Sequence, residues 1–169
     1  QLFLPTVRDE VAFAPQQLGL AREEVAARVD AALTALNMVK LADRAPYNLS
    51  EGEKKKVAIA SVLSLDPDVW LLDEPLASLD PRTGAWITDF LFSLAERGKT
   101  LIIATHDLAI VQQIAHRVCV LDEAHRLIAC GRPNVVLEDE SLLLRANLIY
   151  NGHRAWQRPA RDFVARGEI

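Results

Sequence analysis

The chain has 169 residues, of which 50% are hydrophobic and 25% are charged, and its formal net charge is −4. This length suits one domain with a substantial core, and the acidic balance disfavours nucleic acid as the main partner, because proteins bind phosphate backbones through an excess of Lys and Arg. No apolar stretch approaches the roughly 18 residues that a membrane-spanning helix needs.

The first part of the chain predicts two helices after an irregular start. In residues 1–20, Pro5 and Pro15 flank a short segment at 11–13 that we expect to be extended. Apolar residues at helical spacing predict a helix over 22–41, and residues 45–48 predict a loop. A second helix is expected over 51–65, with the three lysines at 54–56 in solvated positions of its first turns.

The second part alternates short apolar runs with helical segments. The runs at 69–72 and 101–104 are bounded by turn residues, which is typical of strands covered on both faces in a parallel sheet. Between them, Pro81 marks the start of a helix that continues over 85–97 to Gly98. The remaining expected elements are a helix over 108–117, a strand over 118–121, a turn over 122–125 and a hairpin strand over 126–130. This order predicts an α/β domain with a parallel sheet.

Two carboxylates and a histidine follow the predicted parallel strands. Asp73 and Glu74 come directly after the first strand, and His106 follows the second. Because ligands of parallel sheets gather beyond the carboxyl ends of the strands, we expect these residues at one edge. One carboxylate can hold Mg²⁺ near a nucleotide's phosphates, and the next can polarise an attacking water. The alternative is a structural cap and a solvated glutamate, which Pro75 and the turn at 78–80 disfavour.

The start of the helix at residue 51 has two compatible interpretations. Ser50 and Glu53 form the S-x-x-E pattern of a capping box, which needs no function. A helix N-terminus also presents free N–H groups to a phosphate, and Gly52 allows close backbone approach. Glu53 is an awkward neighbour for a phosphate because its carboxylate repels it.

His106 could likewise be structural, although Asp107 after it is expected to cap a helix at the proposed active edge.

One apparent motif is rejected. Residues 93–100 read SLAERGKT, close to the phosphate loop G-x-x-x-x-G-K-[ST], but Ser93 stands in place of the first glycine. Gly98-Lys99-Thr100 also leaves a helix and enters a strand, whereas a phosphate loop leaves a strand and enters a helix. No other Gly-Lys pair occurs in the chain.

Cys119 and Cys130 are the two cysteines of the sequence, and both lie in apolar, strand-like segments. Their spacing does not suit a metal site. We therefore expect buried, reduced thiols of a cytosolic protein.

Four short segments in this order resemble the ATP-binding cassette (ABC) ATPases. LSEGE at 49–53 is similar to the signature loop, and VWLLDEP at 69–75 to the second Walker motif. Ser78-Leu79-Asp80 is similar to the D-loop, and His106 to the switch histidine. The resemblance implies the α/β, parallel-sheet core of a P-loop NTPase with a helical signature subdomain, whose N-terminal part, with the phosphate loop, is expected to lie upstream of Gln1.

Within this family, residues 1–20 and 132–148 resemble the cobalt and energy-coupling-factor (ECF) type of transporter ATPase. The stretch Glu10 to Pro15 is similar to an Asp-Val-Ala-Phe-Gly-Pro segment of those proteins, and Gln1-Leu2-Phe3 to a segment just beyond the Q-loop glutamine. The resemblance implies a peripheral subunit on the cytoplasmic face of the plasma membrane that couples ATP hydrolysis to uptake of a metal ion, such as cobalt or nickel, or of a vitamin.

The resemblance also implies a role for each matching residue. Two domains would sandwich ATP head to tail; Asp73 would hold Mg²⁺, Glu74 would orient the attacking water and His106 would contact the γ-phosphate. The signature residues Ser50, Gly52 and Glu53 would face the ATP held by the partner domain, and Asp80 would line the dimer contact. Glu51 and Glu53 replace the family's usual glycine and glutamine. Without a phosphate loop, the chain alone is expected to bind Mg-ATP poorly.

The resemblance divides the chain into a segment with the signature subdomain at 1–65, a sheet core at 66–131, a helical segment at 132–150 and a tail at 151–169. The expected partners are a second ABC ATPase subunit and integral membrane subunits, with no nucleic acid. Two alternatives stay open, a soluble ABC ATPase that acts on DNA or ribosomes and a truncated, non-catalytic ABC partner. The tail is expected to be a solvated end.

Overall fold

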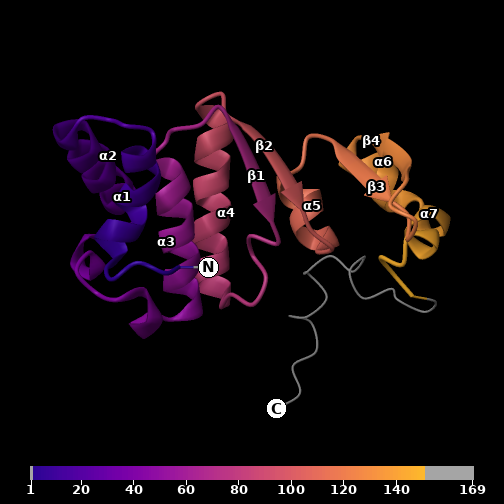
Figure 1. Ribbon diagram of the computed structural model, residues 1–169. Helices are drawn as coiled ribbons and strands as arrows, with labels where there is room; N and C mark the ends of the chain where they lie inside the picture. The colour runs from indigo at the N-terminus through magenta and orange to yellow at the C-terminus, as the bar shows by residue number, and fades with distance from the viewer. Residues whose placement is uncertain (1, 151–169) are drawn as a thin grey trace, which may run out of the picture. The chain divides into compact units, whose positions relative to one another are not determined.

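The computed structural model describes residues 2–150, which fall into two compact units, one within Gln1–Ala104 and the other within Thr105–Ile169 (Figure 1). The predicted tail at 151–169 lies outside the described residues, and the finer division of the chain into subdomains stays a prediction.

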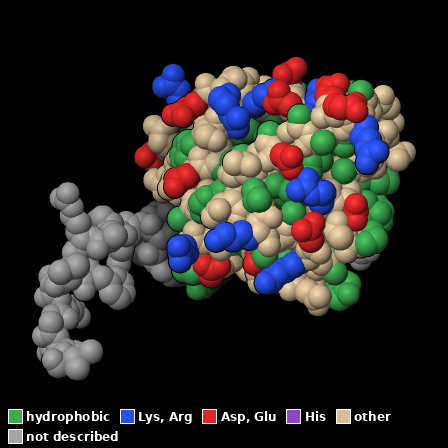
Figure 2. Space-filling model, turned by 90° about the vertical axis from the view of Figure 1, so that its left-hand side faces the viewer, with side chains coloured by type: hydrophobic (Ala, Val, Ile, Leu, Met, Phe, Trp, Pro, Cys, Tyr) green, Lys and Arg blue, Asp and Glu red, His purple; other side chains and the backbone are tan. Residues whose placement is uncertain are grey.

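The first unit begins with a cluster of helices. Helix α1 spans Val7–Gln17, α2 spans Arg22–Ala35 and α3 spans Glu51–Leu63, with short 3-10 turns at Val39–Leu41 and Pro46–Asn48. Helix α1 packs against both α2 and α3. The buried apolar residues of these three helices include Val7, Val11, Val29, Leu33 and Val57. The surface seen from this side of the molecule carries both acidic and basic side chains (Figure 2). Arg8 of α1 and Asp30 of α2 form an ion pair at 2.7 Å.

The extended segment expected at 11–13 is wrong, because these residues lie inside α1. Thr6 caps the helix by accepting the N–H of Asp9 at 3.1 Å. Pro15 cannot donate to the carbonyl of Val11 one turn earlier, and the Ser64 hydroxyl donates to that carbonyl instead, at 3.0 Å. A buried hydroxyl from α3's C-terminal end thus replaces the hydrogen bond that proline removes.

Helix α2 ends six residues before the predicted boundary at 41. Asn37 adopts a left-handed φ of 54°, and the N–H of Met38 bonds back to the carbonyl of Leu33 at 2.8 Å. This is the Schellman arrangement, in which a left-handed residue ends the helix. Gly98, with φ of 82°, ends α4 in the same way, as its position in the sequence predicted.

The first unit also contains a pair of parallel strands. Strands β1 (Val69–Asp73) and β2 (Thr100–Ala104) pair so that Val69 lies opposite Thr100 and Asp73 opposite Ala104. Helix α4 (Pro81–Glu96) runs alongside the strands (Figure 1). Trp70 of β1 is 2% exposed and packs edge-on against Phe90 of α4, with the two ring centroids 6.4 Å apart.

The prediction that both faces of these strands are covered is wrong for the described residues. Side chains of a strand alternate between its two faces, and α4 covers only the face that carries Trp70. On the other face, Leu71 is 76% exposed and its register partner Ile102 is 57% exposed.

The second unit comprises α5 (Leu108–Ile114), the antiparallel hairpin of β3 (Val118–Leu121) and β4 (Leu127–Gly131), and the short helices α6 (Pro133–Glu138) and α7 (Glu140–Arg145). The hairpin was predicted, but α5 ends three residues earlier than expected, because Ala115 is extended. The hairpin packs on the last helices through Val120, Val136 and Leu142.

The expectation of buried thiols is also wrong, since Cys119 and Cys130 are both exposed. Val120 occupies the inward face of β3, and the period of two therefore turns its neighbour Cys119 outward.

Among residues 2–150, no helix is both long enough and apolar enough to cross a membrane.

Candidate functional site

The carboxylate pair lies at the carboxyl end of β1. Asp73 is the last, exposed residue of the strand, and Glu74 follows it. The N–H of Glu74 donates to the carbonyl of Ala104 at the end of β2, at 2.9 Å. The ends of both strands therefore meet at one edge, as the sequence predicted for a parallel pair.

Glu74 has a left-handed backbone, with φ of 43°. This conformation costs an L-residue other than glycine roughly 1–2 kcal/mol, and such strain persists only where surrounding contacts fix it. One such contact comes from α3, because Lys55 Nζ donates to the carbonyl oxygen of Glu74 at 2.8 Å. Glu74 is thus fixed from both β2 and α3.

The solvated role expected for the three lysines is wrong. Lys55 binds the Glu74 carbonyl, Lys54 pairs with Glu51 at 2.7 Å, and Lys56 Nζ lies 4.1 Å from the centre of the Trp86 ring. All three side chains are partly buried. Sequence reasoning missed Lys55 as part of the site, because no local pattern reports a contact between α3 and the turn after β1.

Asp73 has the donor chemistry that Mg²⁺ requires. Mg²⁺ prefers oxygen ligands and is held by one or two carboxylates together with phosphates and water. Residues 2–150 contain no cluster of three or more candidate metal ligands. A magnesium ion at Asp73 would therefore need other oxygen ligands, and the phosphates of a nucleotide are such ligands.

The N-terminus of α3 forms the predicted capping box. The Ser50 hydroxyl accepts the N–H of Glu53 at 3.3 Å, and the Glu53 carboxylate accepts the N–H of Ser50 at 2.8 Å and its hydroxyl at 2.9 Å. Hydrogen bonds from the Ser50 backbone and side chain lower the pKa of Glu53 below its ordinary value of 4.5. The carboxylate is therefore directed back onto the cap.

Gly52, in the first turn of α3, faces the first turn of α4. A Cβ at Gly52 would lie 3.2 Å from Cγ2 and 3.4 Å from Oγ1 of Thr83. The lack of a side chain at Gly52 thus has a packing reason in addition to the predicted approach to a phosphate. Thr83 was missed from the sequence, because only the packing of α3 on α4 reveals it.

Asp80 is the N-cap of α4, next to this contact. Its carboxylate accepts the N–H groups of Arg82 at 3.1 Å and Thr83 at 3.0 Å. A hydrogen bond from the Thr83 side chain is the largest cause that lowers the pKa of Asp80, followed by the backbone bond from Thr83. Thr83 therefore contacts both Gly52 and Asp80, two of the predicted site residues.

His106 lies at the start of the second unit and is exposed. Asp107 caps α5 as predicted, accepting the N–H groups of Ala109 at 3.0 Å and Ile110 at 3.2 Å. His106 follows the end of β2 by two residues. Its distance from Asp73 and Glu74 stays a prediction.

The rejected phosphate-loop sequence has an ordinary structural role. Gly98 and Lys99 connect α4 to β2, and Lys99 Nζ pairs with Asp66 at 3.0 Å and Asp68 at 3.2 Å. These two ion pairs of Lys99 stabilise the turn before β1.

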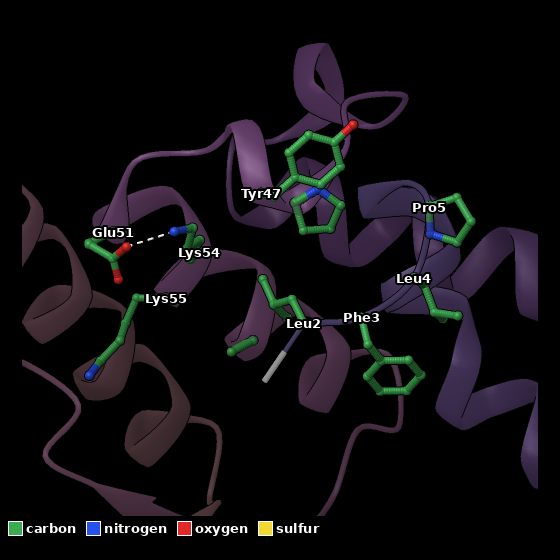
Figure 3. A pocket seen from close by; sticks show the side chains of 10 residues that line it. Leu2, Phe3, Leu4, Pro5, Tyr47, Glu51, Lys54 and Lys55 are labelled. Atoms are coloured by element: carbon green, nitrogen blue, oxygen red, sulfur yellow. Dashed lines mark hydrogen bonds and ion pairs between the residues drawn. The ribbon is translucent and has the colours of Figure 1, made fainter.

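A groove of about 780 Å³ lies between the N-terminal segment and α3 (Figure 3). Its apolar wall includes Phe3, 67% exposed, and Tyr47, 81% exposed. Glu10 fixes the N-terminal segment, because its carboxylate accepts the N–H of Phe3 at 2.9 Å and of Leu4 at 2.8 Å. The opposite end of the groove is charged, with Glu51, Lys54 and Lys55.

Comparison with known proteins identifies a matching family and several relatives. Residues 4–77 match the ABC transporter family. A putative ABC transporter ATP-binding protein of Methanosarcina acetivorans is 54% identical over 89% of this chain and 54% of its own length. The nickel import ATP-binding protein NikO of Rhodobacter capsulatus is 48% identical over 88% of this chain and 59% of its own length.

A solved structure shares the fold. The CbiO1 protein of Clostridium perfringens, described as part of the ABC transporter complex cbiONQ, aligns with a TM-score of 0.72 and 40% identity over 88% of this chain and 59% of that one. The chain thus spans between 54% and 59% of the length of these three proteins. The chain is therefore similar to the ATP-binding proteins of the ABC transporter family, and its α/β fold is that of ABC ATPases.

Proposed function

We propose that this protein is the ATP-hydrolysing, energy-coupling subunit of an ECF-type ABC transporter that imports a metal ion such as nickel or cobalt, or a vitamin. The observation that carries the proposal is the Asp73–Glu74 pair at the end of β1, with Glu74 fixed by Ala104 and Lys55. The names of the relatives, which include a nickel import protein and a member of a transporter complex, support the choice of transport.

In this proposal, the role of Asp73 and Glu74 is to position a magnesium ion and the attacking water. Mg²⁺, when bound, neutralises charge that develops on the transferred phosphoryl group. Asp73 would hold it through the carboxylate. Glu74 would orient the attacking water and accept its proton, a contribution of typically 10²–10⁴-fold in rate. His106 would donate a hydrogen bond to the γ-phosphate.

The start of α3 would act on a nucleotide held by a second ABC domain. Ser50 and the N–H of Gly52 would present hydrogen-bond donors and the positive end of the helix dipole to its phosphates. The Glu53 carboxylate accepts both the N–H and the hydroxyl of Ser50, so a phosphate that bound the Ser50 hydroxyl would have to displace this carboxylate. Asp80 would line the contact between the two domains.

The groove supports a membrane subunit as a further partner. Its apolar rim of Phe3 and Tyr47 lies beside the charged residues Lys54 and Lys55. Such a surface suits an amphipathic segment that presents both apolar and polar side chains. Residues 1–20 would thereby contact an integral membrane subunit, and the protein would sit on the cytoplasmic face of the membrane.

The test is ATP hydrolysis by the protein expressed from its complete gene together with its membrane subunits. Glu74→Gln should lower the rate at least 100-fold while ATP binding persists. Glu96→Gln, at the exposed end of α4, is the matched control and should keep the wild-type rate. Hydrolysis that survives Glu74→Gln would indicate a non-catalytic partner, and binding to nucleic acid in place of the membrane subunits would indicate a soluble ABC ATPase.

A further inference from the structure

Cys119 and Cys130 lie directly opposite each other in the hairpin of the second unit. They are register partners of β3 and β4, and their Sγ atoms are 2.8 Å apart. Both side chains are exposed. No step of the proposed ATPase mechanism uses them, so the pair requires its own explanation.

The backbone geometry of this pair permits a disulfide. Directly opposed residues of antiparallel strands have Cα atoms roughly 4.5 or 5.5 Å apart, depending on the hydrogen-bond pattern. Disulfides span Cα separations of about 4.4–6.8 Å, so either pattern falls within this range. The two side chains also project from the same face of the hairpin. Bond formation therefore needs only local side-chain rotation.

The turn of the hairpin fixes the two strands on each other. The N–H of Asp122 donates to the carbonyl of Arg126, and the N–H of Arg126 donates to the Asp122 carboxylate, both at 2.9 Å. The Arg126 guanidinium adds an ion pair to that carboxylate at 2.8 Å. On the inward face, Val120 packs against Val136 of α6. The folded hairpin therefore presents the two thiols to each other before any reaction.

We propose that Cys119 and Cys130 are a redox modification site that forms a reversible cross-strand disulfide by exchange with a low-molecular-weight disulfide such as oxidised glutathione. The first thiol loses its proton and attacks the glutathione disulfide, which forms a mixed disulfide and releases one reduced glutathione. The second thiol loses its proton and attacks the mixed disulfide, which releases the second glutathione. Two electrons pass from the cysteines to the glutathione disulfide, and excess thiol reverses both steps.

The first step is expected to be the slow one. The hydrogen bond to Cys130 is the largest cause that raises the pKa of the Cys119 thiol above its ordinary value, although the charge of Arg117 acts in the opposite direction. Because only the thiolate attacks, the smaller thiolate fraction of Cys119 slows its attack on the glutathione disulfide. The second step occurs between groups already in contact, and such intramolecular reactions have high effective concentrations.

The experiment uses the protein expressed from its complete gene, incubated with oxidised glutathione, blocked with an alkylating reagent and digested with trypsin. Cleavage after Arg117 and Arg126 places the cysteines in separate peptides, 118–126 and 127–145. In the native protein we expect these peptides to be joined by a disulfide, with no accumulation of a glutathione adduct. Dithiothreitol should separate them.

The matched variants are Cys130→Ser and Cys119→Ser, which should each retain the glutathione adduct on the remaining cysteine. The same reaction in concentrated urea needs no variant, and there the adduct should accumulate in the wild-type protein because the hairpin no longer aligns the thiols. Accumulation of the adduct on native wild-type protein, or recovery of both peptides unlinked and alkylated, would overturn the proposal. The result does not depend on whether the protein hydrolyses ATP.

Discussion

Replacement of Gly52 by alanine separates a packing role for this glycine from a nucleotide-binding role. The added Cβ would lie 3.2 Å from Cγ2 of Thr83, closer than the optimal carbon–carbon separation of about 3.5–4.0 Å. Thr83 cannot easily yield, because its backbone N–H donates to the Asp80 carboxylate at 3.0 Å. Overpacking of this kind costs typically 1–3 kcal/mol, whereas removal of a glycine from a helix gains roughly 0.5–1 kcal/mol. We expect Gly52→Ala to lower the free energy of unfolding by about 1 kcal/mol.

The matched background is Thr83→Ser, which removes Cγ2 and keeps both the hydroxyl and the backbone N–H that donates to Asp80. Without the methyl group, the gain from the removed glycine should dominate, and Gly52→Ala should stabilise the chain by about 0.5 kcal/mol. The coupling energy of the two substitutions would then be about 1.5 kcal/mol, within the range for residues in contact. Urea unfolding followed by tryptophan fluorescence measures it, because Trp70 and Trp86 both lie in the first unit.

The cycle has a clear negative outcome. If Gly52→Ala has the same effect on stability with Thr83 and with serine at that position, the two residues are not coupled and the packing argument is wrong. If ATP hydrolysis by the protein from the complete gene is lost in both backgrounds although stability is restored in the second, the glycine is needed for the nucleotide as well.

Three further predictions concern other contacts of the first unit. Ser64→Ala should lower the free energy of unfolding by about 1–3 kcal/mol in urea titrations, because it leaves the buried carbonyl of Val11 unpaired. Adding Pro15→Ala to this variant should recover part of the loss, because the new N–H can donate to that carbonyl. A double variant whose change equals the sum of the two single changes would contradict this. The pKa of Glu53 is lowered in the folded chain, so the ionised carboxylate contributes to the free energy of unfolding above pH 4.5, and this contribution is lost as the pH falls through the folded pKa. The difference in free energy of unfolding between the wild type and Glu53→Gln should shrink in that window. A constant difference would refute the capping role. Lys55→Met should lower ATP hydrolysis about 10- to 100-fold by misplacing Glu74, with ATP affinity retained, and unchanged hydrolysis would remove Lys55 from the site.

Elements whose signals are local could be predicted from the sequence. The strands at 69–72 and 101–104 were each predicted to within one residue, because apolar runs between turn residues suit no other element of that length. The capping box of Ser50 and Glu53 and the cap formed by Asp107 were also predicted, since the side chain that caps a helix lies within three residues of the N–H it accepts.

Features that depend on distant partners could not be predicted in this way. Helix α1 contains Pro15, which normally ends a helix, and only the hydroxyl of Ser64 on another helix compensates the lost hydrogen bond. The exposure of Cys119 depends on which face of the hairpin packs against α6, and strand periodicity alone does not define that face. Sequence patterns reveal that a strand alternates, but tertiary packing decides which side is buried.

The same reasoning applies to Lys55 and Thr83, which connect the predicted site residues of the first unit. Lys55 joins α3 to the backbone of Glu74, and Thr83 lies against Gly52 of α3 and donates its N–H to Asp80 at the start of α4. A hydrogen bond to a charged group contributes about 1.5–3 kcal/mol, comparable with the 1–2 kcal/mol that a left-handed glutamate costs. Because the two energies nearly balance, a movement of α3 that breaks the Lys55 contact would weaken the support of this strained conformation and leave the hydrogen bond to Ala104 to maintain it. The conformation of Glu74 therefore depends in part on the position of α3, and under the proposed function a change at the N-terminal end of this helix is expected to alter hydrolysis through Lys55.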